Sequence, residues 1–139
     1  MIIRPAEEKD ISKIARIGQI PEFEIASGGW IPPEAYKRML SKDFFLVAED
    51  CGKIAGFIAG EPMQISPLVM IWFFMVVENQ RGKGTGKKLL DKFEQNCRKN
   101  GIKYIILYSP LENEDTKGFY LGRNFNEGKK FIEMTKALE

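Results

Sequence analysis

The stretch ENQRGKGTGKKLLDKF, Glu78–Phe93, has three glycines at alternate positions, Gly82, Gly84 and Gly86, set among basic residues. An apolar run precedes it, and apolar residues at helical spacing follow it, so the pattern predicts a buried strand, a tight loop and a helix. The first turn of a helix leaves about four backbone N–H groups without intrahelical partners, and the helix dipole adds positive charge there. The stretch therefore predicts an anion site, with a solvated basic turn as the alternative.

Two familiar phosphate-binding motifs do not match this loop. A P-loop begins with Gly and ends with Gly-Lys-Ser/Thr, but Arg81 takes the place of its first glycine and Lys88 that of its hydroxyl residue. The dinucleotide fingerprint spaces its last two glycines three residues apart, and here the spacing is two. What remains is an Arg-x-x-Gly-x-Gly loop, in which bare backbone and the charges of Arg81, Lys83 and Lys87 would together hold a pyrophosphate.

Length and composition predict one domain spanning residues 1–139 with a substantial core, since 44% of the residues are hydrophobic. A net charge of +2 argues against a nucleic-acid partner. The longest apolar run is too short to cross a membrane, and charges interrupt the N-terminus where a secretion signal would be apolar. We therefore expect a cytoplasmic protein without a membrane partner.

Histidine is absent, which excludes Ser-His and Cys-His catalysis and removes the commonest metal ligand. The two cysteines, Cys51 and Cys97, match no metal spacing. No metal site is expected, and any proton transfer has to use a carboxylate, Tyr, Lys, Cys or water.

Hydrophobic periodicity predicts a mixed α/β, α+β-like domain. Asp10 is expected to cap the first helix, and Asn100-Gly101 to end the long helix that follows the glycine loop. The strands before and after that long helix should be parallel, because a crossover of this length joins them. Strands are expected at 1–5, 43–50, 53–62, 68–79 and 102–109 and in a final hairpin at 125–138 turning at Glu127-Gly128, and helices at 11–18, 33–41, 86–100 and 112–124.

RGKGTG at 81–86, following an apolar strand, resembles the signature of the GNAT superfamily of N-acetyltransferases, which bind acetyl-CoA. A second match is Asn113 followed seven residues later by Tyr120, within a segment that ends GFYLGRNF. The family usually has Gly where this chain has Asn124, and Asn also tolerates left-handed backbone. The resemblance implies a mostly antiparallel sheet with one parallel pair splayed at the cofactor site, flanked by about four helices.

The resemblance further implies an enzyme that moves an acetyl group from acetyl-CoA to a primary amine by direct attack in a ternary complex. Tyr120 would protonate the departing thiolate, and the backbone N–H near Val76 would bind the acetyl carbonyl. Asn113 would bind pantetheine or anchor its loop, with a helix N-cap as a compatible alternative. The implied cofactor-binding residues are Phe74, Met75, Val76, Val77, Arg81, Gly82, Lys83, Gly84, Thr85, Gly86, Lys87, Asn113 and Tyr120.

The general base is the least defined part of this interpretation. Some family members carry a Glu on the fourth strand, whereas residues 68–77 contain no acid. Glu61 is the expected base, and Glu22, Glu24 or a water chain are the alternatives. Glu78 is expected to be solvated.

The acceptor is expected over residues 21–36, where Glu22 and Glu24 would hold a cationic amine and Trp30 would supply an apolar wall. Surface charge and packing of the helix pair are the alternative roles of these residues. A small-molecule amine, a lysine and a protein N-terminus all stay open as acceptors, and so does a homodimer. The competing function is a non-catalytic acyl-CoA-binding regulatory module, which the missing strand carboxylate favours.

Overall fold

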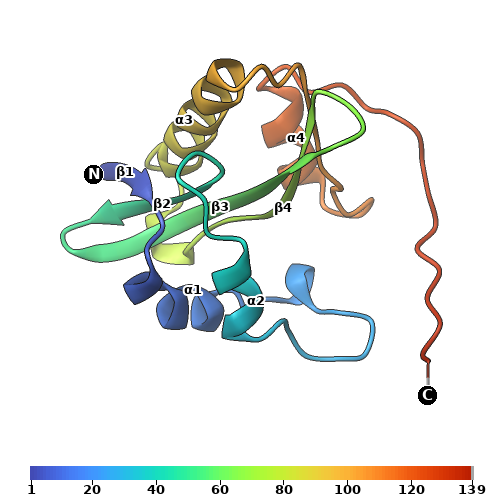
Figure 1. Ribbon diagram of the computed structural model, residues 1–139, viewed down its shortest axis with the longest axis horizontal. Coiled ribbons are helices and arrows are strands. Elements are labelled where there is room, and N and C mark those ends of the chain that lie inside the picture. Colours follow the sequence, from blue (N-terminus) through green and yellow to red (C-terminus); the bar gives the residue numbers. More distant parts are fainter. Residues whose placement is uncertain (139) are drawn as a thin grey trace.

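A five-stranded sheet, ordered β1-β2-β3-β4-β5, forms the centre of the protein (Figure 1). The computed structural model describes residues 1–138. Neighbouring strands are antiparallel except β4 and β5, which are parallel because a helical crossover joins them. The strands are β1 (Ile2–Pro5), β2 (Phe45–Asp50), β3 (Lys53–Met63), β4 (Leu68–Val76) and β5 (Tyr104–Ile106).

Helices cover both faces of this sheet, with α3 and α4 on one face and α1 and α2 on the other (Figure 1). The predicted mixed architecture, with one parallel pair and four α-helices, is thereby confirmed. The helices are α1 (Ile11–Ile17), α2 (Pro33–Arg38), α3 (Thr85–Lys99) and α4 (Glu114–Leu121), with short 3₁₀ helices η1 (Glu8–Asp10), η2 (Pro21–Phe23) and η3 (Glu78–Gln80).

Each face of the sheet has its own apolar layer. Beneath α3, Leu89, Leu90 and Phe93 are fully buried, as the helical spacing predicts. A Cβ on Gly60 of β3 would lie 2.6 Å from Cζ of Phe93, so the bare backbone lets α3 approach the sheet closely. On the opposite face, the rings of Tyr36 and neighbouring phenylalanines of the sheet fill the layer under α1 and α2.

The predicted end of α3 is confirmed. Gly101 adopts left-handed backbone with φ 73°, and its N–H donates to the Arg98 carbonyl at 3.1 Å. The Ile102 N–H donates to the Cys97 carbonyl at 2.9 Å. These two bonds form a Schellman motif, which satisfies carbonyls that the helix leaves free and turns the chain toward β5.

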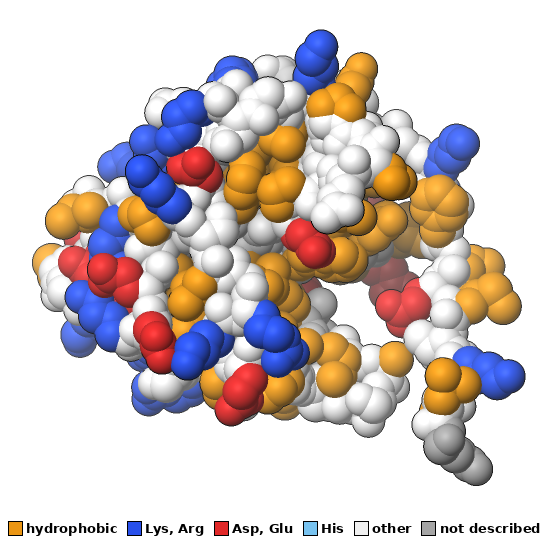
Figure 2. Space-filling model, viewed as in Figure 1, with side chains coloured by type: hydrophobic (Ala, Val, Ile, Leu, Met, Phe, Trp, Pro, Cys, Tyr) orange, Lys and Arg blue, Asp and Glu red, His pale blue; other side chains and the backbone are white. Residues whose placement is uncertain are grey.

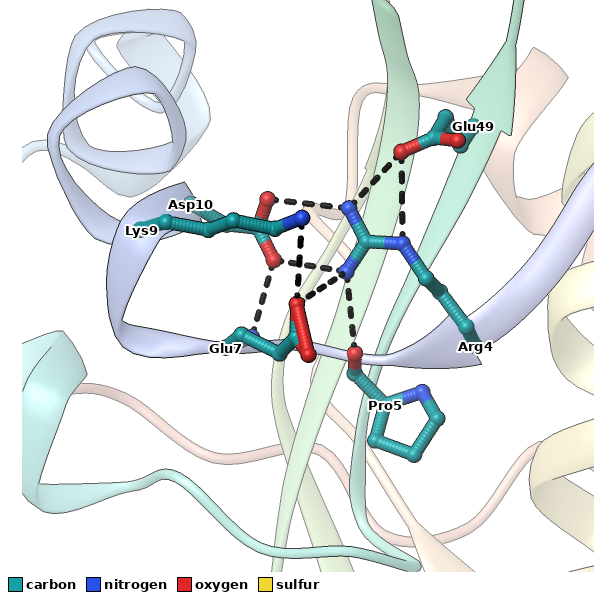
Figure 3. Close-up of polar contacts among 6 residues, drawn as sticks. All are labelled: Arg4, Pro5, Glu7, Lys9, Asp10 and Glu49. Carbon is teal, nitrogen blue, oxygen red and sulfur yellow. Dashed lines mark hydrogen bonds and ion pairs between the residues drawn. The ribbon is translucent and has the colours of Figure 1, made fainter. Parts of the chain in front are cut away.

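Asp10 occupies the N-cap position of α1, as predicted, but its side chain makes no capping hydrogen bond to that helix. Its carboxylate accepts instead from the Arg4 guanidinium at 2.7 and 3.0 Å and from the Glu7 N–H at 2.8 Å (Figure 3). Arg4 also donates to Glu49 at 2.9 Å. The Asp10 carboxylate thereby links the start of η1 to β1, and Arg4 extends the link to Glu49 of β2.

The predicted C-terminal hairpin is absent, and the strand expected over 102–109 is reduced to β5. Residues 126–138 form neither helix nor strand and stand off from the body of the protein (Figures 1 and 2). Gly128 does not adopt the positive φ that a tight hairpin turn favours, and Glu127 pairs with Lys117 of α4 at 3.0 Å. The segment's apolar side chains, Phe131, Ile132, Met134 and Leu138, are exposed.

Within residues 1–138, no helix is both long enough and apolar enough to cross a membrane.

Asp10→Asn should lower the stability of the fold. The hydrogen bonds from Arg4 are the main cause that holds the pKa of Asp10 below its usual value. A depressed folded-state pKa stabilises the protein at neutral pH, and the contribution is lost as the pH falls through that pKa. We expect the variant to lose about 2 kcal/mol of unfolding free energy at neutral pH and progressively less in acid, as measured by urea unfolding.

Glu7→Gln is the matched control, because the Glu7 carboxylate is 56% exposed and lies 3.7 Å from Arg4. Its unfolding free energy should stay close to that of the unsubstituted protein. An Asp10→Asn variant as stable as this control would contradict the assigned role of the carboxylate.

Candidate functional site

The pairing between β4 and β5 ends early and leaves part of β4 open. The register runs from Leu68↔Tyr104 to Met70↔Ile106, although β4 continues to Val76. Past Met70, β4 is paired only with β3 on its other side. Backbone N–H and C=O groups that alternate toward the missing partner are therefore available to another extended chain.

Val76 presents its backbone to this open side. The Val77 N–H donates to the Ala55 carbonyl of β3 at 2.8 Å, and successive residues of a strand point their amides in opposite directions. The Val76 N–H consequently faces away from β3. Its carbonyl accepts from Arg81 Nε at 3.1 Å, which ties the glycine loop to the end of β4.

The loop after β4 has a backbone that only glycine adopts readily. Gly82 and Gly84 have φ of 77° and 80°, and Gly84 is the N-cap of α3. Because glycine has no side chain, it cannot cap the first amides of the helix, and the Lys88 N–H makes the first intrahelical bond, to the Gly84 carbonyl. The N–H groups of Thr85, Gly86 and Lys87 thus form an uncapped helix N-terminus directly beyond the open part of β4.

The other predicted loop residues lie in less special settings. Gly86 has ordinary helical backbone, and a Cβ there would only touch Phe119 and Val76 at 3.5–3.6 Å, so the structure does not require a glycine. The side chain of Thr85 is buried and donates to the Gln80 carbonyl at 3.4 Å. Lys87 pairs with Asp91 at 2.9 Å, one turn along α3, while Lys83 is exposed.

Tyr120 lies on α4 against the open part of β4. Its ring centroid is 6.2 Å from that of Phe74 and 5.3 Å from that of Phe125. Burial raises the pKa of Tyr120 to about 12, so the phenol keeps its proton at any physiological pH. The side chain of Met75 belongs to the layer under α1 and α2, which leaves only its backbone for a ligand.

Two asparagines hold α4 in place. The Asn113 side chain accepts from the Thr116 N–H at 3.0 Å, so Asn113 is the N-cap of the helix. Asn124 adopts left-handed backbone with φ 68° and donates its N–H to the Leu121 carbonyl at 3.2 Å, while the Phe125 N–H donates to the Tyr120 carbonyl at 3.1 Å. Asn124 therefore occupies the position usually taken by glycine in a Schellman motif, as its tolerance of left-handed backbone predicts.

An acidic cleft of about 480 Å³ lies beside the N-terminus of α4 and is lined by Glu22 of η2. Of the predicted acceptor residues only Glu22 borders it, since Glu24 is exposed elsewhere and the Trp30 indole N–H donates to the Ile20 carbonyl at 2.7 Å as a loop anchor. The acidic residues on its other side were not predicted, because the motif recognised at Asn113 and Tyr120 says nothing about the charges beside it. These are Glu112, Glu114 and Asp115.

The predicted base Glu61 is exposed and lies on β3, where its carboxylate accepts from the Trp72 indole N–H at 2.9 Å. Glu78 is exposed in η3, as expected. Across residues 1–138, no group of three or more carboxylate or thiol side chains is arranged to hold a metal ion.

The sequence profile of the acetyltransferase (GNAT) family matches residues 19–125. The chain belongs to the GNAT family of acetyltransferases. It is accordingly an acyltransferase, and the recognised signature at 81–86 lies inside the matched range. A comparison with curated proteins gives no match.

Solved structures of other family members share the fold. Ard1 from Thermoplasma volcanium is 26% identical, with a TM-score of 0.80 over 92% of this chain and 84% of that one. An aminoglycoside acetyltransferase from an uncultured soil metagenomic sample, in complex with sisomicin, is 20% identical, with a TM-score of 0.75 over 99% and 96%. Diaminobutyrate acetyltransferase EctA from Paenibacillus lautus, in complex with L-2,4-diaminobutyric acid and coenzyme A, is 20% identical, with a TM-score of 0.76 over 88% and 73%.

Asn124→Val should destabilise the end of α4. A β-branched side chain is strained at φ 68°, so the variant should lose about 1–2 kcal/mol of unfolding free energy in urea. Asn124→Gly is the control, and it should be as stable as the unsubstituted protein because glycine adopts this backbone without strain. Equal stability of the Val and Gly variants would contradict the left-handed assignment.

Proposed function

We propose that this chain transfers an acetyl group from acetyl-CoA to a primary amine by direct attack in a ternary complex. The observation that carries the proposal is the continuity of two unsatisfied backbone surfaces, the open part of β4 and the uncapped N-terminus of α3. One suits an extended amide-containing arm and the other suits a pyrophosphate. Coenzyme A contains both groups in that order.

The pyrophosphate would bind to the first amides of α3, with Gly82 and Gly84 keeping side chains away from it. Arg81 and Lys83 would add positive charge from the loop. Lys87 would contribute through its amide, because its ammonium pairs with Asp91. The pantetheine arm would then run back along β4 as an added strand, placing the thioester near the start of the opening.

Free β4 amides near the start of the opening would stabilise the negative charge that develops on the acetyl oxygen, whereas the Val76 N–H, at the far end of β4, would bind the pantetheine arm. The amine arrives as an ammonium ion and must lose a proton before its nitrogen can attack. Glu61 is the carboxylate proposed to take that proton. When the new C–N bond forms and the C–S bond breaks, the departing thiolate would take the phenolic proton of Tyr120. The attacking nitrogen would then lose its second proton, which would return the Tyr120 phenolate to the phenol.

Direct attack is favoured over an acetylated cysteine. Cys97 lies in the apolar layer under α3, where burial raises the pKa of its thiol to about 12. Cys51 lies at the turn between β2 and β3, at the start of β3. The opening of β4 begins after Met70, which pairs with Glu61 near the other end of β3, so Cys51 is far from the proposed thioester. Neither thiol has the activating surroundings of a catalytic cysteine.

The acceptor is proposed to be a cationic amine. The acidic cleft containing Glu22 adjoins the Asn113 cap of α4, the helix that carries Tyr120, and its charge would attract a positively charged molecule. A small-molecule amine, a lysine and a protein N-terminus all meet this description.

A non-catalytic acyl-CoA-binding module is the competing function, and the absence of an acid from residues 68–77 favours it. Thiol release from acetyl-CoA separates the two when it is measured with sisomicin, L-2,4-diaminobutyric acid and an alanyl peptide amide. If thiol is released faster with an amine than in the control that lacks amine, the result supports an acetyltransferase. Tight CoA binding without release from any of the three supports the module.

Gly84→Glu should abolish CoA binding while the protein stays folded. The new carboxylate would repel the pyrophosphate, and like charges in contact cost several kcal/mol, so the Kd measured by calorimetry should rise by at least about 100-fold. Left-handed backbone at this position adds a strain of about 1–2 kcal/mol, which thermal unfolding would register.

Gly84→Ala is the matched control, since it carries the same strain without the charge. It should retain measurable CoA affinity, because a Cβ at this position meets no atom within 4 Å. Unchanged CoA affinity in folded Gly84→Glu would refute the proposed pyrophosphate site.

Tyr120→Phe should lower kcat by about 100-fold with little change in the Kd for CoA, because it removes only the proton donor. Phe119→Tyr leaves Tyr120 in place and serves as a check on disturbance of the α4 surface. If Tyr120→Phe turns over as fast as the unsubstituted enzyme, Tyr120 has no part in catalysis.

A further inference from the structure

Trp72 sits in an irregularity of β4. Phe73 pairs with Ala59 and Ile71 with Gly60, so the register of β3 and β4 shifts and Trp72 has no opposite residue on β3. This is a β-bulge, which locally re-aims side chains. The bulge begins directly after Met70, where β5 leaves β4. Trp72 therefore lies at the start of the open part of β4.

The bulge directs Trp72 to the face covered by α1 and α2. Gly60 faces Phe93 beneath α3, so the next residue of β3, Glu61, faces the opposite side of the sheet. The Trp72 indole N–H donates to the Glu61 carboxylate at 2.9 Å, which places both side chains on that face. Phe73, on the same face, packs against Phe23 of η2 with ring centroids 5.0 Å apart.

Both members of this pair are open to solvent. Trp72 is 46% exposed, which is unusual for so large an apolar side chain in the middle of a strand, and Glu61 is exposed. The other tryptophan differs, because the Trp30 indole donates to a backbone carbonyl and anchors a loop. A solvated indole that donates its N–H to an exposed carboxylate contributes little to stability but offers an aromatic face beside a negative charge.

We propose that Trp72 and Glu61 form the subsite for the ammonium group of the acceptor, an inference that rests on the proposed function. The carboxylate supplies the opposite charge, and the face of the indole supplies a cation–π contact. The indole N–H holds the carboxylate in one orientation, which reduces the side-chain entropy lost on binding. Trp72 is thus a positioning residue for Glu61, and the pair selects cationic amines.

The first test measures binding without requiring turnover. In a Trp30→Phe background Trp72 is the sole indole, so its fluorescence reports on the subsite directly. The probes are sisomicin, L-2,4-diaminobutyric acid and an alanyl peptide amide, each titrated with and without CoA. At least one amine should change the Trp72 emission saturably. Adding Glu61→Gln should raise the Kd of that amine by about tenfold. Glu94→Gln, the same change on the outer surface of α3, should leave its affinity unchanged.

The second test separates positioning from a structural role. Trp72→Phe keeps an aromatic ring but loses the N–H, so it should raise the KM for the acceptor by about fivefold and leave the KM for acetyl-CoA and the melting temperature unchanged. The double variant Trp72→Phe/Glu61→Gln should bind the acceptor no more weakly than Glu61→Gln alone, because Phe keeps an aromatic face and the lost N–H acts only through the Glu61 carboxylate.

Two results would overturn the inference: no emission change with any of the three amines, or equal amine affinity in the parent and Glu61→Gln proteins. Both results come from binding measurements, so either one would overturn the inference whether or not the enzyme is active. CoA binding and thiol release by the unsubstituted protein test the proposed function separately, so the two failures are distinguishable.

Discussion

Strand β4 pairs with β3 along its whole length except at the bulge of Trp72, but it pairs with β5 only from Leu68 to Met70. Open backbone in the middle of a sheet is costly unless water or another chain satisfies it. The remaining features are arranged around this opening. The loop at Gly82 and Gly84 turns the chain at its far end, and α4 approaches through contacts of Phe119 and Tyr120 with Phe74.

The sheet also separates the two proposed proton-transfer groups. Tyr120 contacts Phe74 on the face covered by α3 and α4, whereas Glu61 points to the face covered by α1 and α2. In the proposed reaction, Tyr120 of α4 and Glu61 of β3 would therefore approach the reactants from opposite sides of the sheet.

Much of this arrangement could be predicted because it depends on local chemistry. The buried stripe of α3, the glycine end at Gly101 and the left-handed Asn124 each follow from spacing or backbone preference. The hydrogen bonds of the Asp10 side chain could not be predicted, because its guanidinium partner, Arg4, belongs to another element. The bulge at Trp72 was also hidden, since the continuous apolar run over 68–77 has no alternation from which a register shift could be read.

The segment 126–138 has a sequence typical of a strand but no strand partner, because pairing is decided by tertiary contacts. At the same time β5 is the last strand of the sheet. An edge strand and an exposed apolar segment containing Phe131, Ile132 and Met134 in one molecule are the ingredients of intermolecular cross-β pairing. The charges of Lys129, Lys130, Glu133 and Lys136, interspersed among these apolar residues, oppose such pairing between molecules.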